Sequence, residues 1–263
     1  MATCKVCRDP LAIEVDAEDS GDEGQTVPDD LELACGCHFH WQCFLDQSPQ
    51  VALSLQCPSC ATYLPTNQPG PSTTNSLLPS TPGAAILTRY SNEGGTEENL
   101  DILPTVTEEA FLASNPEARP ARALHLMAAE GDVSGIVDLL QDAERPAEEE
   151  EEEEGPRLNA KQLFLWRDPL NGGKSIIHVA IESQQEEVFW LALWLSSATP
   201  VQLFPTTVAQ VAQAMGLDRL PVTSAAEDVR FMQDDSGLKA EDLCKRAGAG
   251  WADLVSQGLF VSH

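Results

Sequence analysis

Apolar side chains recur at helical spacing through the second half of the chain. From residue 121 to residue 263, leucine, isoleucine and valine three or four positions apart alternate with turn residues, which is typical of packed amphipathic helices. The pattern of residues 206–216 predicts one such helix. Residues 148–154, all glutamate, interrupt the pattern, and we expect residues 143–157 to form a solvated acidic loop. The second half therefore predicts a mainly α domain.

The middle of the chain has little to bury. Residues 66–83 read TNQPGPSTTNSLLPSTPG, a Pro/Ser/Thr-rich composition that is typical of a flexible tether. A short extended piece at 85–90 and a helix at 107–114, begun by threonine and two glutamates, are the only regular elements expected there. We therefore predict a disordered linker with little regular structure over residues 63–120.

Residues 1–62 have few large apolar side chains but hold seven of the eight cysteines. We expect a cytoplasmic or nuclear protein, because no charged-then-apolar leader opens the chain and no apolar run of about 18 residues could span a bilayer. Clustered cysteines in a reducing compartment are more often metal ligands than disulfides. Ordinary buried cysteines or a redox cluster are the alternatives, although this density and pairing favour metal.

The net charge excludes some partners. With −27 at pH 7 and a pI near 4.2, most of the surface would repel nucleic acid and anionic membrane. We expect no nucleic-acid or membrane partner, and a protein or peptide partner instead. A further hypothesis is that the glutamate run attracts a basic partner, through an attraction that high salt would weaken.

Nine potential metal donors lie in residues 1–62, and five of them fall in one dense stretch, CGCHFHWQC. Two Cys-x-x-Cys pairs bracket it, and such pairs form turns whose sulfurs reach one ion. Two tetrahedral zinc ions need eight donors, so one donor is spare. Sites filled by four protein ligands have no open position, which makes the two Zn²⁺ ions structural. The nine donors are Cys4, Cys7, Cys35, Cys37, His38, His40, Cys43, Cys57 and Cys60.

This spacing resembles a RING finger, a small cross-brace zinc finger of the α+β class. The resemblance implies that the first and third ligand pairs share one ion and the second and fourth pairs share the other. The central RING motif usually reads Cys-x-His-x-Phe-His-x-x-Cys, and Cys37 occupies the position that is more often histidine. The implied ligands are Cys4, Cys7, His40 and Cys43 for one zinc, and Cys35, Cys37, Cys57 and Cys60 for the other.

His38 is then the spare donor. If His38 were a ligand, only Phe39 would separate it from His40, although the two would bind well-separated ions. If Cys37 is the ligand instead, two residues, His38 and Phe39, separate it from His40 and span the distance between the two ions more easily. A PHD finger has the same ligand order but places four or five residues between its fourth and fifth ligands, where this chain has two. The RING resemblance is therefore preferred.

The resemblance implies a RING-type E3 ubiquitin ligase, which docks a ubiquitin-charged conjugating enzyme (E2). Val6, inside the first Cys-x-x-Cys, and Pro58, after the seventh ligand, match the usual E2-docking positions. Two usual contacts are missing, because Gln47 stands where tryptophan is frequent and Ala61 where an arginine often follows the last ligand. The alternative function is a non-catalytic zinc-binding scaffold for protein–protein interaction. No nucleophile–base pair, Rossmann glycine pattern or open metal site supports an independent hydrolase or oxidoreductase.

Three stretches of the second half can be aligned with one another: LHLMAAEGD from Leu124, GKSIIHVA from Gly173 and DSGLKAEDLC from Asp235. They resemble ankyrin repeats, each a turn and two antiparallel helices. Leu124 and Ile177 lie 53 residues apart, about 20 more than one period of about 33, and the acidic loop fills the excess. The 64 residues from Gly173 to Gly237 predict a degenerate repeat between them. The resemblance implies an ankyrin-type solenoid over 121–263 that recruits the protein substrate.

Other signals in this half have structural interpretations. His125 and His178 match the ankyrin histidine that hydrogen-bonds to neighbouring turns. Residues 173–175 resemble the end of a P-loop, but Asp168 occupies the position of the required glycine. Trp166, Trp190 and Trp194 lie at helical spacing, which favours core positions over a ligand groove.

Overall fold

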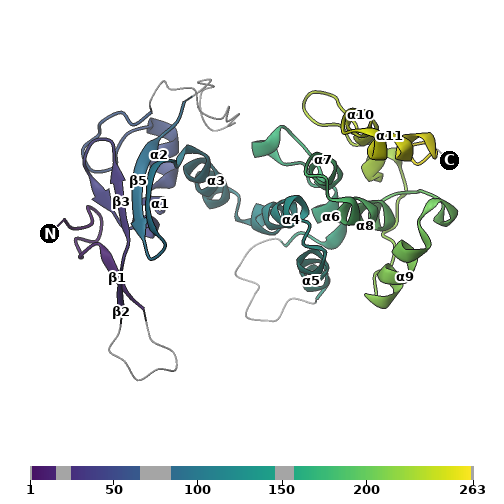
Figure 1. Cartoon of the computed structure of the whole chain (residues 1–263), viewed down its shortest axis with the longest axis horizontal. Coiled ribbons are helices and arrows are strands. Elements are labelled where there is room, and N and C mark those ends of the chain that lie inside the picture. Colours follow the sequence, from purple (N-terminus) through teal and green to yellow (C-terminus); the bar gives the residue numbers. More distant parts are fainter. Residues whose placement is uncertain (1, 16–24, 66–83, 146–156, 262–263) are drawn as a thin grey trace. The chain divides into compact units, whose positions relative to one another are not determined.

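A computed structural model describes residues 2–15, 25–65, 84–145 and 157–261 (Figure 1). The chain divides into two compact units, Met1–Asn115 and Pro116–His263, each with its own buried apolar core. The structure is therefore mixed α/β, with small sheets in the first unit and helices in both. No helix of the described residues is long and apolar enough to cross a membrane. Most of the acidic loop predicted at residues 143–157, including the glutamate run at 148–154, lies outside the described residues.

Two antiparallel sheets organise the first unit. Strands β1 (Ala12–Val15) and β2 (Gln25–Pro28) form a hairpin, and a second sheet has the order β4-β3-β5-β6. Its strands are β3 (Asp30–Leu33), β4 (His38–Phe39), β5 (Leu87–Asn92) and β6 (Gly95–Asp101). Along β3, Leu31 and Leu33 are buried while the alternate residues are partly exposed, which is the period-two pattern of a sheet with one covered face.

Three helices complete this unit: α1 (Trp41–Leu45), α2 (Ser48–Ser54) and α3 (Leu103–Ser114). Helix α3 packs against α2, and the core between helices and sheet is apolar. Its largest members include Leu31, Phe39, Phe44, Val51, Ile86, Ile102 and Val106. Two sequence regions, one before residue 65 and one after residue 84, therefore build a single core.

The predicted linker is wrong for residues 87–114. They form β5, β6 and α3, and β5 pairs with β3 so that Tyr90 lies opposite Leu31. The expected extended piece and helix fall on β5 and α3, but β6 was missed because most of its side chains are polar and exposed. Burial of Ile86, Ile102 and Val106 explains why this region folds onto the first. Residues 66–83 lie outside the described residues.

The second unit is helical, as its apolar spacing predicted. Its helices are α4 (Arg119–Glu130), α5 (Val133–Ala143), α6 (Ala160–Phe164), α7 (Ile176–Glu182), α8 (Glu186–Ser196), α9 (Thr206–Ala214), α10 (Ala240–Arg246) and α11 (Ala249–Ser256). Short 3₁₀ turns at Pro116–Ala118, Pro169–Asn171, Val201–Leu203, Ala225–Glu227 and Val229–Phe231 join them.

Three helix pairs, α4/α5, α7/α8 and α10/α11, form the body of this unit. The first helices make a row, because α4 packs on α7 and α7 packs on α10 (Figure 1). The predicted degenerate repeat between the second and third pairs is wrong. Helix α9 forms where expected, but only 3₁₀ turns separate it from α10, and α10 covers α7 directly. No helix pair therefore lies between α7 and α10 among the described residues.

Candidate metal centre

Both Cys-x-x-Cys pairs form tight turns. In the first, the backbone N–H of Arg8 donates to the carbonyl of Cys4 at 3.0 Å, and a β-bridge between Thr3 and Pro10 closes the loop. Arg8 has a φ of 72°, so the chain reverses through a left-handed residue directly after Cys7. The turn brings the sulfurs of Cys4 and Cys7 within 4.8 Å of each other.

The second turn repeats this geometry. The N–H of Ala61 donates to the carbonyl of Cys57 at 2.9 Å, Gln56 and Tyr63 form the closing bridge, and Ala61 has a φ of 57°. Because the same contacts recur at the same offsets, the two turns are local structures determined by their own spacing.

The central donors come from the β3–β4 hairpin and the start of α1. Gly36, with a φ of 76°, forms the tip between Cys35 and Cys37, where the glycine relieves the steric cost of a left-handed backbone. His40 directly follows β4, and Cys43 lies in the first turn of α1. The two donors of the hairpin tip therefore lie near the second Cys-x-x-Cys turn, while His40 and Cys43 lie near the first.

The donors form two groups, and within each group every donor atom lies within 4.8 Å of the others. The groups are Cys4, Cys7, His40 and Cys43, and Cys35, Cys37, Cys57 and Cys60. They interleave along the chain, so that alternate ligand pairs belong together. These are the two sets that the RING resemblance implied, and each can hold a metal ion.

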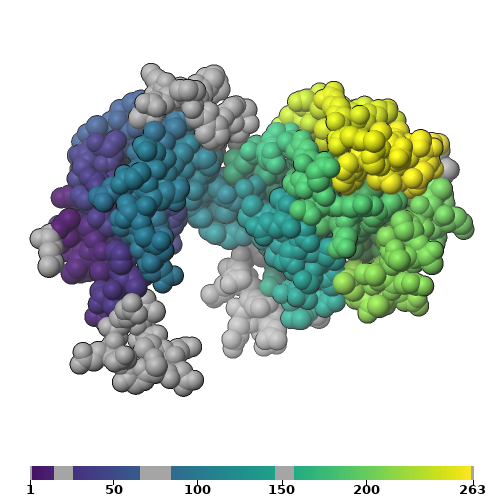
Figure 2. All heavy atoms as spheres, in the orientation of Figure 1, coloured from purple at the N-terminus to yellow at the C-terminus, as the bar shows by residue number. Residues whose placement is uncertain are grey.

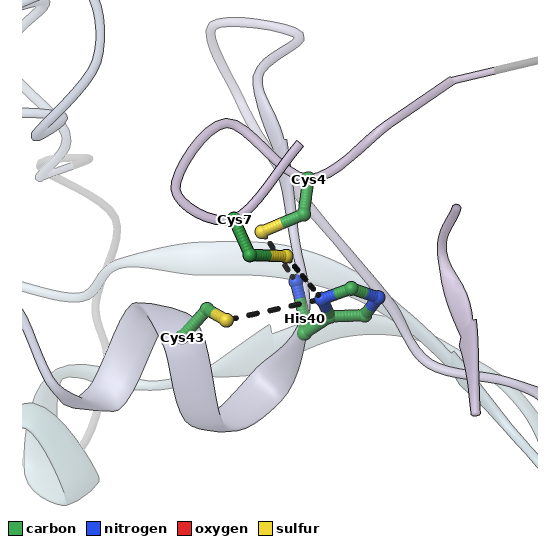
Figure 3. Close-up of side chains that lie close together, drawn as sticks. All are labelled: Cys4, Cys7, His40 and Cys43. Atoms are coloured by element: carbon green, nitrogen blue, oxygen red, sulfur yellow. Dashed lines mark hydrogen bonds between the residues drawn. The ribbon is translucent and has the colours of Figure 1, made fainter. Parts of the chain in front are cut away.

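In the first group the four side chains point toward a common centre (Figure 3). His40 Nδ1 lies 3.3 Å from Cys7 Sγ and 3.8 Å from Cys43 Sγ. Tetrahedral zinc, with Zn–S of about 2.3 Å and Zn–N of about 2.0 Å, separates sulfur and nitrogen by about 3.6 Å. The donor set and its spacing therefore fit zinc.

A backbone contact sets the tautomer of His40. Its other ring nitrogen, Nε2, lies 2.8 Å from the carbonyl of Pro10. A carbonyl only accepts hydrogen bonds, so Nε2 carries the proton and Nδ1 presents its lone pair to the group. The Pro10 carbonyl was not identified from the sequence, since nothing in its local pattern distinguishes it.

The thiols differ in acidity. Burial raises the pKa of Cys35 and of Cys43 to about 12. Burial also acts to raise the pKa of Cys4, but backbone N–H groups, led by that of His40, lower it to about 7. A hydrogen bond with the Thr62 hydroxyl lowers the pKa of Cys60 to about 6. A bound dication would supply the positive charge that keeps all the thiols of a group deprotonated.

His38 lies outside both groups. Its Nδ1 makes a 2.8 Å contact with the carboxylate of Asp30, on the strand that pairs with β4. The ninth donor therefore has a partner of its own, as expected for the spare one. Cys244, the cysteine of the second unit, is buried and belongs to neither group, and burial raises the pKa of its thiol to about 12.

Asp29 connects the metal-binding region to β5 and was also not found from the sequence. Its carboxylate accepts the N–H of Trp41 at 3.1 Å, at the start of α1, and the Tyr90 hydroxyl at 3.0 Å. The Trp41 and Tyr90 rings lie 4.8 Å apart. The sequence signal is weak because Tyr90 lies 61 residues from Asp29.

The proposed E2-docking residues lie in the two matching turns. Val6 is 43% exposed, and Pro58 is partly buried. Gln47 precedes α2 and is partly exposed, and Ala61 is exposed. The structure thus leaves these positions at least partly exposed, while the candidate metal ligands converge.

No family model, curated protein or solved structure matches this chain. Its function is therefore inferred from its own geometry and from the resemblances of its motifs.

Proposed function

We propose that the chain is a RING-type E3 ubiquitin ligase that binds two structural Zn²⁺ ions. The observation that supports this most strongly is the interleaving of two closed four-donor groups, because this ligand order is the cross-brace of the RING family. The exposed Val6 between two ligands of the first group adds an apolar contact where RING fingers dock an E2.

The chain's own contribution is to hold the reactants in place. Four protein ligands fill each metal position, so neither ion has a place for a reactive water. Chemistry takes place on the thioester of the charged E2, and the ligase supplies proximity and orientation to a substrate lysine.

The helical unit recruits the protein substrate as an ankyrin-like array. His178 supports this assignment: its Nδ1 contacts the Ser175 hydroxyl at 2.8 Å and its Nε2 lies 3.0 Å from the carbonyl of Leu238, in the turn before α10. This is the contact to a neighbouring turn that the ankyrin histidine makes. The same expectation is wrong for His125, because neither of its buried ring nitrogens has a hydrogen-bond partner among the described residues. The row of first helices, α4, α7 and α10, is consistent with stacked repeats.

A non-catalytic scaffold is the second proposal, and Gln47 and Ala61 favour it. They replace the tryptophan and arginine that the RING resemblance leads us to expect. A scaffold would bind the same zinc ions and the same partner but would not accelerate transfer.

A transfer assay separates the two proposals. The zinc-loaded chain is incubated with ubiquitin, activating enzyme and a panel of E2s, beside Cys35→Ser and Val6→Ala variants. A ligase makes ubiquitin chains that are lost in both variants, whereas inactivity with every E2 supports the scaffold. Val6→Ala keeps all eight ligands, so an effect of this variant without zinc loss indicates docking.

Ala61→Arg is a gain-of-function test. The matching turn already carries an arginine with a left-handed backbone, Arg8 at φ 72°, so arginine is compatible with this conformation. For a ligase that lacks only the arginine donor, we expect Ala61→Arg to increase the rate of transfer. Ala61→Lys is the matched control, because lysine keeps the charge but loses the planar group of donors.

A further inference from the structure

A groove opens in the helical unit between α8, α9 and the turn that precedes α5. Its volume is about 750 Å³, within the range of natural ligand sites. Helix α9 packs against α8, and α5 also contacts α8. Figure 2 shows α5 in teal and α9 in light green at the molecular surface. All residues that line the groove belong to the unit Pro116–His263.

The floor of the groove is apolar. Trp190 and Leu191 come from α8, Val208 and Val211 come from α9, and Met215 follows that helix. Val211 is 49% exposed, and a flexible methionine adapts to different apolar partners. The prediction that the tryptophans belong to the core was incomplete, since Trp190 is buried and yet forms part of this floor.

The rim of the groove is acidic. Asp132, Glu186 and Glu187 line it and are exposed, and no lysine or arginine is among the lining residues. Internal bonds hold two of the carboxylates there. Asp132 accepts the N–H of Gly135 at 2.9 Å, and Glu186 accepts the indole N–H of Trp190 at 3.2 Å. The rim therefore presents fixed negative charge beside an apolar surface.

A neighbouring cation does not neutralise this rim. Arg219 packs over the Trp194 ring at 5.7 Å, and its Nε donates to the carbonyl of Trp194 at 3.1 Å. The guanidinium also contacts the Ser197 carbonyl and the Phe204 ring. These contacts engage it with α8 and its C-terminal turn.

We propose that this groove binds a partner's amphipathic helix that carries lysine or arginine beside its apolar face. Two packed helices form a concave floor into which a third helix can pack its ridges. Strand addition has no template, because the described residues of this unit contain only isolated β-bridges and no sheet edge. A second copy is disfavoured by charge, since it brings the same acidic rim and a net charge of −27. The inference rests on the proposed function only in treating the partner as a substrate.

The test uses the full, zinc-loaded chain and a fluorescent amphipathic Leu/Lys peptide of about four helical turns. Fluorescence anisotropy measures its Kd, beside a Leu/Glu peptide and a Leu/Lys peptide of shuffled order. We expect binding of the ordered Leu/Lys peptide alone. No binding of this peptide, or equal binding of the shuffled or acidic peptide, overturns the proposal.

Matched variants separate the groove from the general charge of the protein. Glu186→Gln/Glu187→Gln keeps an acceptor for Trp190 and should weaken binding about fivefold. Asp138→Asn/Asp253→Asn removes the same charge from exposed positions that do not line the groove, and should change Kd less than about twofold. Val211→Asn tests the apolar floor and should also weaken binding. Circular dichroism verifies folding of each variant, and equal effects of the two double variants overturn the proposal.

This experiment fails or succeeds independently of ubiquitin transfer. Peptide binding that depends on the groove in a chain without ligase activity supports the groove and refutes the catalytic proposal. Ligase activity in a chain that does not bind the peptide supports the catalytic proposal and refutes the groove.

Discussion

His40 and His38 lie two positions apart but have different surroundings. His40 has Nδ1 within a group of three sulfurs and Nε2 against the Pro10 carbonyl, whereas His38 contacts Asp30. Because β-strand side chains alternate between faces, positions two apart share a face only while the strand continues. Strand β4 ends at Phe39, so the two imidazoles are free to differ.

This contrast predicts the metal content of two variants. His40→Ala leaves three donors in the first group, and we expect the protein to retain one zinc firmly after dialysis against a moderate chelator. His38→Ala is the matched control and should retain two. Native mass spectrometry counts the ions. Two firmly bound ions in His40→Ala, or one in His38→Ala, would show that the ligands are assigned wrongly.

His125 predicts a pH dependence of stability. Burial, followed by the nearby charges of Arg122 and His178, lowers its pKa from 6.5 to about 3. Below pH 6.5 the unfolded state therefore binds a proton that the folded state does not, so stability falls as pH decreases toward 3. The loss is about 2 kcal/mol between pH 6.5 and pH 5, at about 1.4 kcal/mol per pH unit.

Urea unfolding of the wild type and of His125→Gln checks this. Tryptophan fluorescence reports mainly on the helical unit, because four of the five tryptophans lie there. The variant should lose less stability over this pH range. A residual slope is expected from His178, whose pKa burial also lowers. The same dependence of stability on pH in both proteins would show that His125 does not cause the loss.

Two glycine turns allow a matched comparison of elements. Gly131 ends α4 with a φ of 82°, and a Cβ there would lie 2.4 Å from Gln185 Oε1. Gln185 also donates to the carbonyl of Ala129 at 3.0 Å, so moving its side chain breaks a contact between the two helix pairs. Gly216 has a φ of 67°, and no atom lies within 4 Å of the position that a Cβ would occupy there.

We therefore expect Gly216→Ala to cost about 1 kcal/mol, which is the energy of the left-handed backbone alone. Gly131→Ala should cost about 1 kcal/mol more, since it also displaces Gln185. Chemical denaturation measures both. Equal losses would mean that Gln185 moves away freely.

The β5–β6–α3 segment predicts where the first unit can be truncated. Without residues 84–115, the core loses Ile86, Ile102, Leu103 and Val106, and each large apolar side chain contributes about 1.5–3 kcal/mol. The total is on the order of the stability of a small domain. A fragment of residues 1–115 should fold with zinc, and one of residues 1–65 should not. A dispersed NMR spectrum from the shorter fragment would contradict this.

Some elements could be predicted from the sequence and others could not, and the difference has physical causes. The metal-binding turns were predictable because Cys-x-x-Cys spacing acts within a few residues, and the helices because their apolar periodicity is local. Strand β6 has exposed polar side chains and is held by pairing with β5, so it has no hydrophobic signature of its own. The register between β3 and β5 depends on contacts between segments far apart in the sequence, such as that of Asp29 with Tyr90. No local pattern specifies such pairing.

At the scale of the molecule, the two units have different origins of stability. The first has both groups that could hold a metal ion, and its apolar core includes candidate ligands such as Cys4, Cys37 and Cys57. The second has the larger apolar core, and its described residues contain no group of metal-binding side chains. Metal binding in small domains contributes on the order of 10 kcal/mol per site, so folding of the first unit should be coupled to zinc, and folding of the second should not.

Zinc removal therefore predicts selective unfolding. After treatment with a strong chelator and a thiol reductant at neutral pH, amide hydrogens of β3, β5 and β6 should exchange rapidly, whereas those of α7 and α8 stay protected. Adding zinc back should restore protection in the strands. Cys244→Ser is the control, because this thiol lies in the second unit outside both groups and its loss should leave zinc-dependent protection unchanged. Loss of protection in α7 and α8 together with the strands would show that the two units unfold as one, and retained protection in the strands would show that their fold does not need the metal.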